Sequence, residues 1–408
     1  MWGSEANPIA HTFREGIMKE SDKTLCLIIA LILGFALVTS AVAQDTITVG
    51  NTQPLTGPKV FIDEGAPLDL GLKDCTAMTN EEGGINGKKL RYVVEDDQFK
   101  PDVGLRAFED LMSKYKPLCV FGSSTGVALA VAPLIRERYK VLYSSSSFSA
   151  KIMTSGTPSM FMVGPTYGDQ FGVALKYIAQ QKKGTRVAFF YSQGPFGEDP
   201  IPYGRIMCQR LRLELVGEVV GDIKGGDHKA QIEELKLKRP DWVILHGWMG
   251  PNNGALIKQC RDLELKAQII TTIWGAQKSV VEGMGPDGPT FLAVSPYAYW
   301  WMDDVPMIQK LKAYTAKNYP EVTDRPLPYI VAFTAGKIFV ECLRKAEAAG
   351  ELNGEGITKA LQSLKDFDTG GLTPPLTIKE NRFPIARVLK SNPAKGIFEP
   401  VSDWIAFY

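Results

Sequence analysis

Two loops rich in small hydroxyl residues follow predicted strands, and their residue types suit anion binding. Residues 122–126 read Gly-Ser-Ser-Thr-Gly, and residues 144–147 are four serines that include Ser146. A helix is predicted directly after the first loop, so Ser124 and Thr125 offer hydroxyls and free backbone N–H groups at its positive end. Such a loop can bind a carboxylate or a phosphate, although simple capping of the helix is the alternative interpretation.

Large aromatic side chains follow predicted strands in the second half of the chain. Phe196, Trp248 and Trp274 each come shortly after a strand end, and five of the seven tryptophans lie between residues 242 and 301. Packing in a core would account for any one of these aromatics. Their shared position after strand ends instead predicts an apolar wall opposite the hydroxyl loops, which suits a small organic acid.

The elements that must position these loops alternate between strand and helix. Strands are predicted at 47–51, 90–95, 118–121, 140–143, 186–191, 215–220, 242–246 and 268–271. Helices are predicted between them at 66–80, 103–115, 127–138, 167–180, 206–213, 229–236 and 253–263. This alternation predicts an α/β fold with parallel sheets and right-handed crossovers. A break at Gly164-Pro165 separates two doubly wound lobes.

The last hundred residues contain too few strands for a third α/β core. Helices are predicted at 305–318, 329–349 and 357–364, and short strands only at 377–378 and 387–389. We therefore expect this part to complete the two lobes, with further crossovers near residues 295 and 374. The expected domains are lobe 1, residues 46–164 plus 295–373, and lobe 2, residues 165–294 plus 374–408. Three crossovers between two lobes make a hinge.

Composition excludes several classes of function. With 46 Lys and Arg against 45 Asp and Glu the net charge is +1, so the chain lacks the strongly positive electrostatic field that attracts nucleic acid. Five cysteines follow the N-terminal segment, namely Cys75, Cys119, Cys208, Cys260 and Cys342. They form no CxxC pair or His-Cys cluster, so we expect no metal and no cofactor. We interpret them as small core residues, with one disulfide left open.

Residues 1–43 are predicted to lie outside the fold. Residues 25–38 form an unbroken apolar run of 14, followed by Ala41-Val42-Ala43, which is typical of a secretory signal cleaved before Gln44. Met18 is a natural start for such a signal, which makes residues 1–17 an upstream extension. The alternative is an uncleaved membrane anchor, but the run is short of the ~20 residues needed to span a bilayer.

Several segments resemble the periplasmic type I solute-binding proteins of branched-chain amino acid ABC transporters, the leucine/isoleucine/valine-binding family. They are Ile-Thr-Val-Gly at 47–50, Pro-Leu-Thr-Gly at 54–57, Gly-Gly-Ile-Asn-Gly at 83–87, Asp-Asp at 96–97 and the segment 122–132. The likeness covers about residues 46–400. It implies a Venus flytrap in the periplasm that closes over one solute, acts as a monomer and delivers the solute to an ABC permease.

The resemblance also implies a set of ligand contacts. In lobe 1 the solute carboxylate would be held by four residues, the last two mainly through backbone groups: Ser124, Thr125, Ser146 and Phe148. In lobe 2 the family has one aromatic residue at the position of Phe196 and another near Trp248 and Met249. The family keeps an acidic residue for the ligand ammonium where this sequence has Trp274. We therefore expect an apolar or aromatic carboxylic acid rather than a free α-amino acid, unless Asp97, Glu198 or Asp199 supplies the missing charge.

Two further departures from the family pattern have structural consequences. Phe99 and Ser124 stand where the family has its lobe 1 disulfide, so that bridge is expected to be absent. Pro200 and Pro202 are expected to delay the helix that follows Phe196 to residue 206.

Three other functions stay open from the sequence alone. An amino-acid-binding protein of the same type is one, and a flytrap sensor without a transport role is another, because the fold would be identical. A serine hydrolase is the third, since Gly-x-Ser-x-Gly surrounds Ser124 between a strand and a helix. Its base would have to be His228 or His246, both in the second lobe, so we expect no enzyme activity and no catalytic residue.

Overall fold

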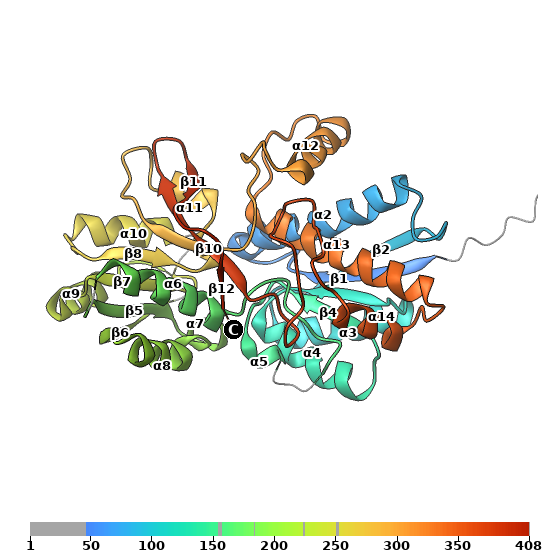
Figure 1. Ribbon diagram of the computed structural model, residues 1–408, viewed down its shortest axis with the longest axis horizontal. Helices are drawn as coiled ribbons and strands as arrows, with labels where there is room; N and C mark the ends of the chain where they lie inside the picture. The colour runs from blue at the N-terminus through green and yellow to red at the C-terminus, as the bar shows by residue number, and fades with distance from the viewer. Residues whose placement is uncertain (1–45, 154–156, 183, 223–224, 250–252, 408) are drawn as a thin grey trace, which may run out of the picture. The chain divides into compact units, whose positions relative to one another are not determined.

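The computed structural model describes residues 46–153, 157–182, 184–222, 225–249 and 253–407 (Figure 1). The predicted signal segment, residues 1–43, lies outside the described residues. None of the helices in the described ranges is both long enough and apolar enough to cross a membrane.

The first sheet has four parallel strands in the order β2-β1-β3-β4. Its strands are β1 (Ile47–Gln53), β2 (Leu90–Asp96), β3 (Cys119–Gly122) and β4 (Leu142–Ser145). The helices between them are α2 (Lys59–Glu81), α3 (Pro101–Lys114) and α4 (Thr125–Glu137), with the short α5 (Ala150–Met153) after β4. Adjacent β3 residues face opposite sides, because Val120 packs with α3 and α4 whereas Phe121 packs with α2.

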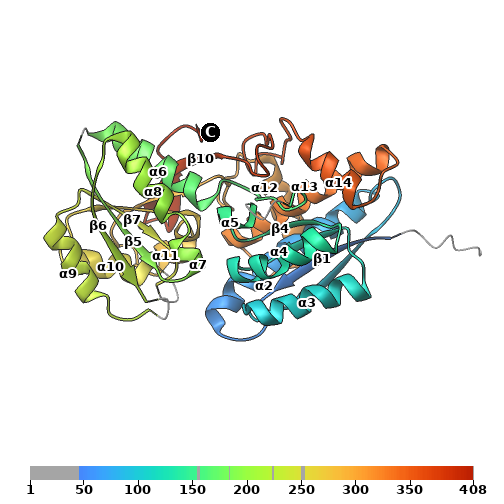
Figure 2. The same cartoon turned by 90° about the horizontal axis from the view of Figure 1, so that it is seen from below.

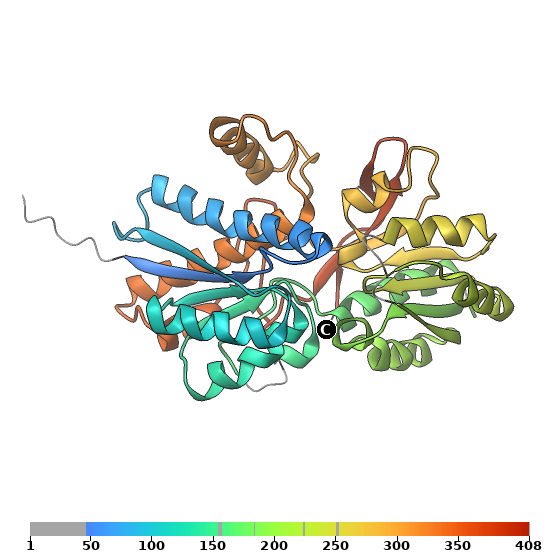
Figure 3. The ribbon, with the colours of Figure 1, turned by 180° about the vertical axis from the view of Figure 1, so that it is seen from behind.

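Helices from the end of the chain return to this first sheet. They are α13 (Leu327–Ala348) and α14 (Gly354–Gln362), and α12 (Pro306–Asn318) precedes them in the chain. α13 runs alongside α2 (Figure 3), and α14 packs against α13 and β4. The close approach of α13 needs a glycine, because a Cβ on Gly71 would lie 2.3 Å from the Tyr329 carbonyl oxygen.

The second sheet follows the order β11-β10-β9-β8-β7-β5-β6. The parallel strands are β5 (Arg186–Ser192), β6 (Glu214–Gly221), β7 (Trp242–His246), β8 (Gln268–Thr271) and β9 (Leu292–Ser295). The strands β10 (Ile385–Asn392), β11 (Ile397–Pro400) and β12 (Ile405–Ala406) are added antiparallel.

Helices cover both faces of the second sheet (Figure 2). On one face α6 (Tyr167–Gln181) and α8 (Ile201–Leu211) pack on Phe189, and on the other α9 (Lys229–Lys238) and α10 (Asn253–Asp262) pack on Phe190. Three short elements, α7 (Pro195–Glu198), the 3-10 turn η1 (Ile273–Gly275) and α11 (Lys278–Glu282), follow strand ends. The predicted α/β class with parallel sheets is confirmed.

The structure corrects four details of the predicted elements. α2 begins at Lys59 rather than at residue 66, with Pro67 inside the helix. β9, β11 and β12 were not expected, because the four buried residues of β9 show no alternating pattern and β11 and β12 are only four and two residues long. Residues 377–378 form no strand. α8 begins at Ile201 rather than at residue 206, because Pro202 lies in the first turn, where a helix needs no N–H donor.

The chain passes between the two sheets' elements three times, between α5 and α6, between β9 and α13, and between α14 and β10. The predicted division into lobes, and the hinge motion of those lobes, stay predictions.

Candidate ligand-binding site

A cavity of about 280 Å³ lies where carboxyl ends of strands from both sheets meet. This volume is at the small end of the range for ligand pockets, which suits one small solute. The loops after β1, β2, β3 and β4, the first turns of α2, and the loops after β5, β7 and β8 line it. The lining residues include six of the eight predicted ligand contacts, namely Ser124, Thr125, Ser146, Phe196, Trp248 and Trp274.

A larger hollow, about 660 Å³, lies at the opposite ends of the second sheet's strands. Its lining includes Thr185, just before β5, together with Trp242 and Gln268, the first residues of β7 and β8. Ligands of open parallel sheets bind outside the carboxyl ends of the strands. We therefore place the candidate site in the smaller cavity.

The serine loops form a connected set of hydroxyls at the start of α4. Ser124 caps the helix by accepting a hydrogen bond from the Val127 N–H, at 3.2 Å between N and Oγ. The hydroxyls of Thr125 and Ser147 lie 2.6 Å apart, and the Ser146 hydroxyl donates to the Ser123 carbonyl oxygen at 2.5 Å. The first N–H groups of α4 have no acceptor within the helix, so this edge of the cavity presents donors.

The opposite wall is aromatic and is itself held by hydrogen bonds. η1 places Trp274 in the cavity wall, where its indole N–H donates to the Tyr167 hydroxyl at 3.0 Å. The ring of Tyr167 lies 5.0 Å from that of Phe196, measured between centroids. Both rings line the cavity, so an apolar solute body would meet fixed aromatic faces.

Phe148 and Met249 do not line the cavity. Phe148 is fully buried, and its ring lies 5.9 Å from both Tyr167 and Trp274, so it packs behind the aromatic wall. Met249 packs against Gly221 at the end of β6, and its backbone N–H donates to the Asn253 side chain. The structure therefore places both residues behind the wall, and their role in ligand binding stays a prediction.

Three stacked rings join the two sides of the cavity. Phe61 from α2 lies 4.2 Å from Phe99, and Phe99 lies 5.7 Å from Trp248, with nearly parallel planes. Phe99 follows β2 with a positive φ of 59°, which Asp97 supports by accepting a hydrogen bond from its N–H at 2.8 Å. The acidic pair after β2 thus shapes a loop that carries an aromatic side chain.

The acidic residue that lines the cavity is Glu64, which sequence reasoning missed. It lies in the second turn of α2, and Gln277 donates a hydrogen bond to its Oε1 at 2.7 Å. Burial raises the pKa of Glu64 from 4.5 to about 7. The cavity therefore has an acid on the first sheet's side. On the second sheet's side, Trp274 stands where the resemblance implies an acidic residue.

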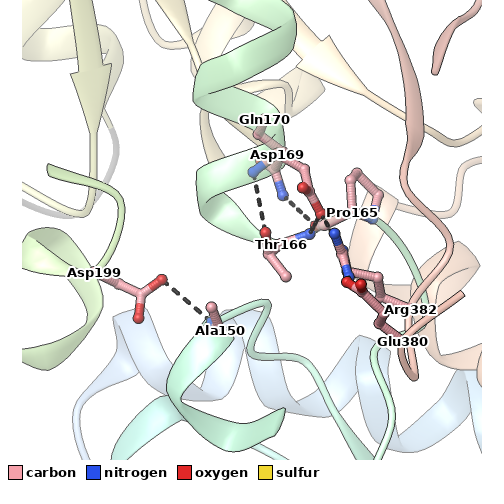
Figure 4. A network of polar contacts seen from close by, with 8 residues as sticks. All are labelled: Ala150, Pro165, Thr166, Asp169, Gln170, Asp199, Glu380 and Arg382. Carbon is pink, nitrogen blue, oxygen red and sulfur yellow. Dashed lines mark hydrogen bonds and ion pairs between the residues drawn. The ribbon is translucent and has the colours of Figure 1, made fainter. Parts of the chain in front are cut away.

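The three acids considered from the sequence have other partners. Asp199 accepts a hydrogen bond from the Ala150 N–H (Figure 4) and another from the Ser149 hydroxyl. Glu198 accepts from the Gly194 N–H at 3.0 Å, and Asp97 holds the loop at Phe99. None of these three acids lines the cavity.

The described contacts of His246 do not support a serine hydrolase. Its Nδ1 lies 2.7 Å from the Thr272 hydroxyl and its Nε2 lies 3.1 Å from the Phe196 carbonyl oxygen. Both ring nitrogens are therefore engaged away from Ser124. Burial lowers the pKa of His246 to about 3, so the ring stays neutral.

A polar network lies at two of the crossovers between the sheets (Figure 4). Asp169 forms a capping box with Thr166 at the start of α6, and its Oδ2 also accepts from Arg382 Nε at 2.8 Å. Arg382 is ion-paired with Glu380 as well. The network ties the segment before α6 to the segment before β10.

The described residues contain no cluster of His, Cys, Asp and Glu that could hold a metal ion. The five cysteines in this part of the chain are buried and unpaired, as expected of small core residues. Phe99 and Ser124, which stand where the family has its lobe 1 disulfide, form part of the cavity wall.

The strand ends of two sheets thus line one cavity, as expected of a binding site in an open α/β fold. The model of the periplasmic binding protein family matches residues 46–388. The chain belongs to this family.

Relatives and solved structures agree with that assignment. The Leu/Ile/Val-binding protein BraC3 of Rhizobium johnstonii is 28% identical over 359 residues, which cover 85% of this chain and 90% of the relative. The leucine-, isoleucine-, valine-, threonine- and alanine-binding protein of Pseudomonas aeruginosa is 25% identical over 86% of this chain and 91% of its own.

Among solved structures, a branched chain amino acid ABC transporter protein from Thermus thermophilus with bound valine superposes with a TM-score of 0.80. It is 23% identical and covers 89% of this chain and 97% of its own. A fatty acid ABC transporter substrate-binding protein from Thermomonospora curvata has a TM-score of 0.75 at 21% identity, covering 89% of this chain and 93% of its own. These two likenesses concern the fold.

Proposed function

We propose that the protein is the extracytoplasmic solute-binding component of an ABC importer and captures a small carboxylate with an apolar or aromatic body. One observation carries this proposal: a single small cavity has hydroxyl and N–H donors at the start of α4 on one side and aromatic rings on the other. The family assignment supports solute binding rather than catalysis.

The serine loops supply the anion receptor of this proposal. A carboxylate at Ser124 and Thr125 would accept hydrogen bonds from neutral donors and lie at the positive end of a 13-residue helix. Neutral donors and a helix dipole can hold an anion without a buried lysine or arginine. The lining indeed contains neither residue type.

The aromatic wall supplies apolar contact area and excludes water. Trp274 is held by its bond to Tyr167 and by Phe148 behind it, so the wall is rigid before a solute arrives. Preorganised contacts of this kind reduce the entropy lost on binding.

The importer role includes an exported protein, a permease partner and a hinge. Family membership favours the periplasm and an ABC permease, and the predicted signal at residues 1–43 agrees with export. Closure around a solute would follow from contacts to both sheets, because a solute that favours the closed state shifts the population toward it.

A branched-chain amino acid is the second candidate solute. It is favoured by the names of the relatives and by Glu64, an acid in the cavity wall that could meet an ammonium group. The two candidates share the carboxylate receptor and differ in what the solute presents to Glu64.

A thermal-shift screen of the exported protein tests the proposal. The panel contains 4-methylpentanoate, 3-phenylpropionate, leucine, valine and phenylalanine, with 3-methylbutanol and 2-phenylethanol as controls that lack a carboxylate. Ligands at 100 to 1,000 times Kd stabilise by ~3 to 4 kcal/mol, which the melting temperature reports. At least one acid should stabilise the protein while the alcohols do not. A flat response to every acid would refute the proposal.

Two variants locate the receptor. Ser124→Ala together with Thr125→Val should weaken binding of the best acid at least tenfold, because two hydroxyl donors are lost. Ser113→Ala, an exposed serine in α3, is the matched control and should leave binding unchanged.

A further inference from the structure

Two buried oxygen atoms in the wall of the cavity, one from a carboxyl group and one from an amide, have no hydrogen-bond partner among the described residues. They are Oε2 of Glu64 and Oε1 of Gln53, and both side chains line the cavity. A buried acceptor without a partner costs ~1 to 3 kcal/mol. Two such atoms in one ligand cavity indicate that the solute supplies the missing donors.

The two side chains come from neighbouring backbone segments. Gln53 is the last residue of β1 and is followed by Pro54. A Cβ on Gly65, the residue after Glu64, would lie 2.5 Å from the Pro54 carbonyl oxygen. α2 is therefore packed directly on the end of β1, which brings Glu64 and Gln53 to the same side of the cavity.

A hydrogen-bond chain orients the Gln53 amide. The side-chain N–H₂ of Asn51 donates to the Tyr92 hydroxyl at 2.9 Å and to Asp69 at 3.5 Å. The Asn51 carbonyl oxygen must then face Gln53, and it accepts from Gln53 Nε2 at 3.0 Å. This chain uses the nitrogen of Gln53 and leaves its oxygen without a donor.

A residue of the second sheet's side orients Glu64. Gln277, which follows η1 and is 6% exposed, donates to Glu64 Oε1 at 2.7 Å. The same amide nitrogen also contacts the Trp274 carbonyl oxygen at 3.4 Å. One oxygen of the Glu64 carboxyl is thus occupied, and the other is left for the solute.

No cation among the described residues neutralises Glu64. The lining of the cavity contains no lysine, arginine or histidine. On α2, Asp63 is a like charge, and Lys59 is ion-paired with Asp63. Next to Gln277, Lys278 is paired with Asp324 and with Glu282. Burial accordingly raises the pKa of Glu64 to about 7. A hydrogen bond donated by the solute would lower this pKa again, because it favours the ionised carboxylate.

We propose that Glu64 and Gln53 are specificity-determining residues that accept hydrogen bonds from an N–H or O–H group carried by the solute in addition to its carboxylate. This inference rests on the proposed carboxylate-binding function. An ammonium has three N–H donors and satisfies both oxygens, a hydroxyl satisfies one, and a plain hydrocarbon satisfies none. The expected order of affinity is amine, then hydroxyl, then hydrogen, opposite to the order that Trp274 predicts.

Matched solutes test the order by calorimetry on the exported protein. One trio is leucine, 2-hydroxy-4-methylpentanoate and 4-methylpentanoate, and the other is phenylalanine, 3-phenyllactate and 3-phenylpropionate. Within the trio that binds, the amine should bind roughly 10 to 150 times more tightly than the deaminated acid, the range for a hydrogen bond to a charged group. If the hydroxy acid binds with an affinity between those of the amine and the deaminated acid, the site accepts a hydrogen bond from either a hydroxyl or an amine.

Variants assign the preference to the two residues. Glu64→Gln turns the free position into an N–H₂ donor, so the preference for the amine should fall to within twofold. Gln53→Met should reduce the preference for the amine without abolishing it, because Glu64 still accepts a hydrogen bond from the solute. Asp63→Asn, one residue away and exposed, is the matched control and should keep the full preference. Melting temperatures without solute confirm that each variant is folded.

The pH dependence adds a readout that a structural role would not move. A donor favours the ionised form of Glu64, so binding of the amine should release a proton and weaken as pH falls from 7.5 to 5.5. In Glu64→Gln this dependence should vanish. The inference is overturned if the deaminated acid binds as tightly as the amine, or if Glu64→Gln keeps the preference. If none of the acids binds, the proposed function itself is overturned instead.

Discussion

Mild acid should destabilise the protein through His246, a fully buried imidazole at the end of β7. Rings pack around it, with Tyr167 at 4.8 Å and Phe196 at 4.9 Å between centroids. Burial lowers the pKa of His246 from 6.5 to about 3. The folded protein therefore keeps the ring neutral at pH values where the unfolded chain gains a proton.

The size of the effect follows from the two pKa values. Stability is unaffected well above pH 6.5 and is lost as pH falls from there toward the folded pKa, because only the unfolded state binds the proton. Between pH 7 and pH 5 the free energy of unfolding should fall by about 2 kcal/mol from this group. The figure barely depends on the folded pKa, which lies well below pH 5.

Urea unfolding at pH 7 and pH 5 measures the effect in pairs of variants. His246→Phe keeps a ring but cannot titrate, so its loss between the two pH values should be about 2 kcal/mol smaller than that of the wild type. Thr272→Val removes the partner of Nδ1 and keeps the imidazole, so it should be less stable at both pH values but retain the wild-type difference. Raised pKa values at Glu64 and Asp97 act in the opposite direction and are shared by all three proteins. Equal pH differences in wild type and His246→Phe would refute the reasoning.

Four other predictions concern the site, the crossovers and export. Trp274→Ala should weaken the best solute by ~1 to 3 kcal/mol in calorimetry, as expected for a buried aromatic contact, and unchanged affinity would remove it from the site. Arg382→Met should lower the free energy of unfolding by ~1.5 to 3 kcal/mol, because Asp169 loses a charged donor, whereas Lys395→Met in an exposed ion pair should cost at most ~1 kcal/mol. X-ray scattering should show a smaller radius of gyration with bound solute, and an identical profile at saturation would contradict a hinge. N-terminal sequencing of the exported protein should find Gln44 or a neighbour, and an intact 25–38 segment would contradict cleavage.

Local sequence patterns were sufficient for most of the α/β architecture. β7 and β8 were predicted at their observed bounds, and β1, β3 and β5 within about two residues, because each is an apolar run that ends at a turn. β9 was missed since four buried residues carry no period. The start of α8 was misplaced because Pro202 was taken as a barrier, although a proline in the first turn costs no hydrogen bond.

The sequence alone indicated that the loops after β3, β4, β5, β7 and β8 contribute to the cavity. Strand direction and the rule that ligands lie at carboxyl ends need only the order of elements, so Ser124, Thr125 and Trp274 could be identified from their position after a strand. Glu64 could not, because it lies before residue 66, where its helix was predicted to begin, and no local pattern separates it from an ordinary surface acid. Tertiary structure decided its position in the cavity wall, since α2 packs on Pro54 at Gly65 and Gln277, 213 residues away, donates a hydrogen bond to its carboxyl. Burial and pairing of a charge are properties of contacts between distant segments, and a one-dimensional pattern does not contain them.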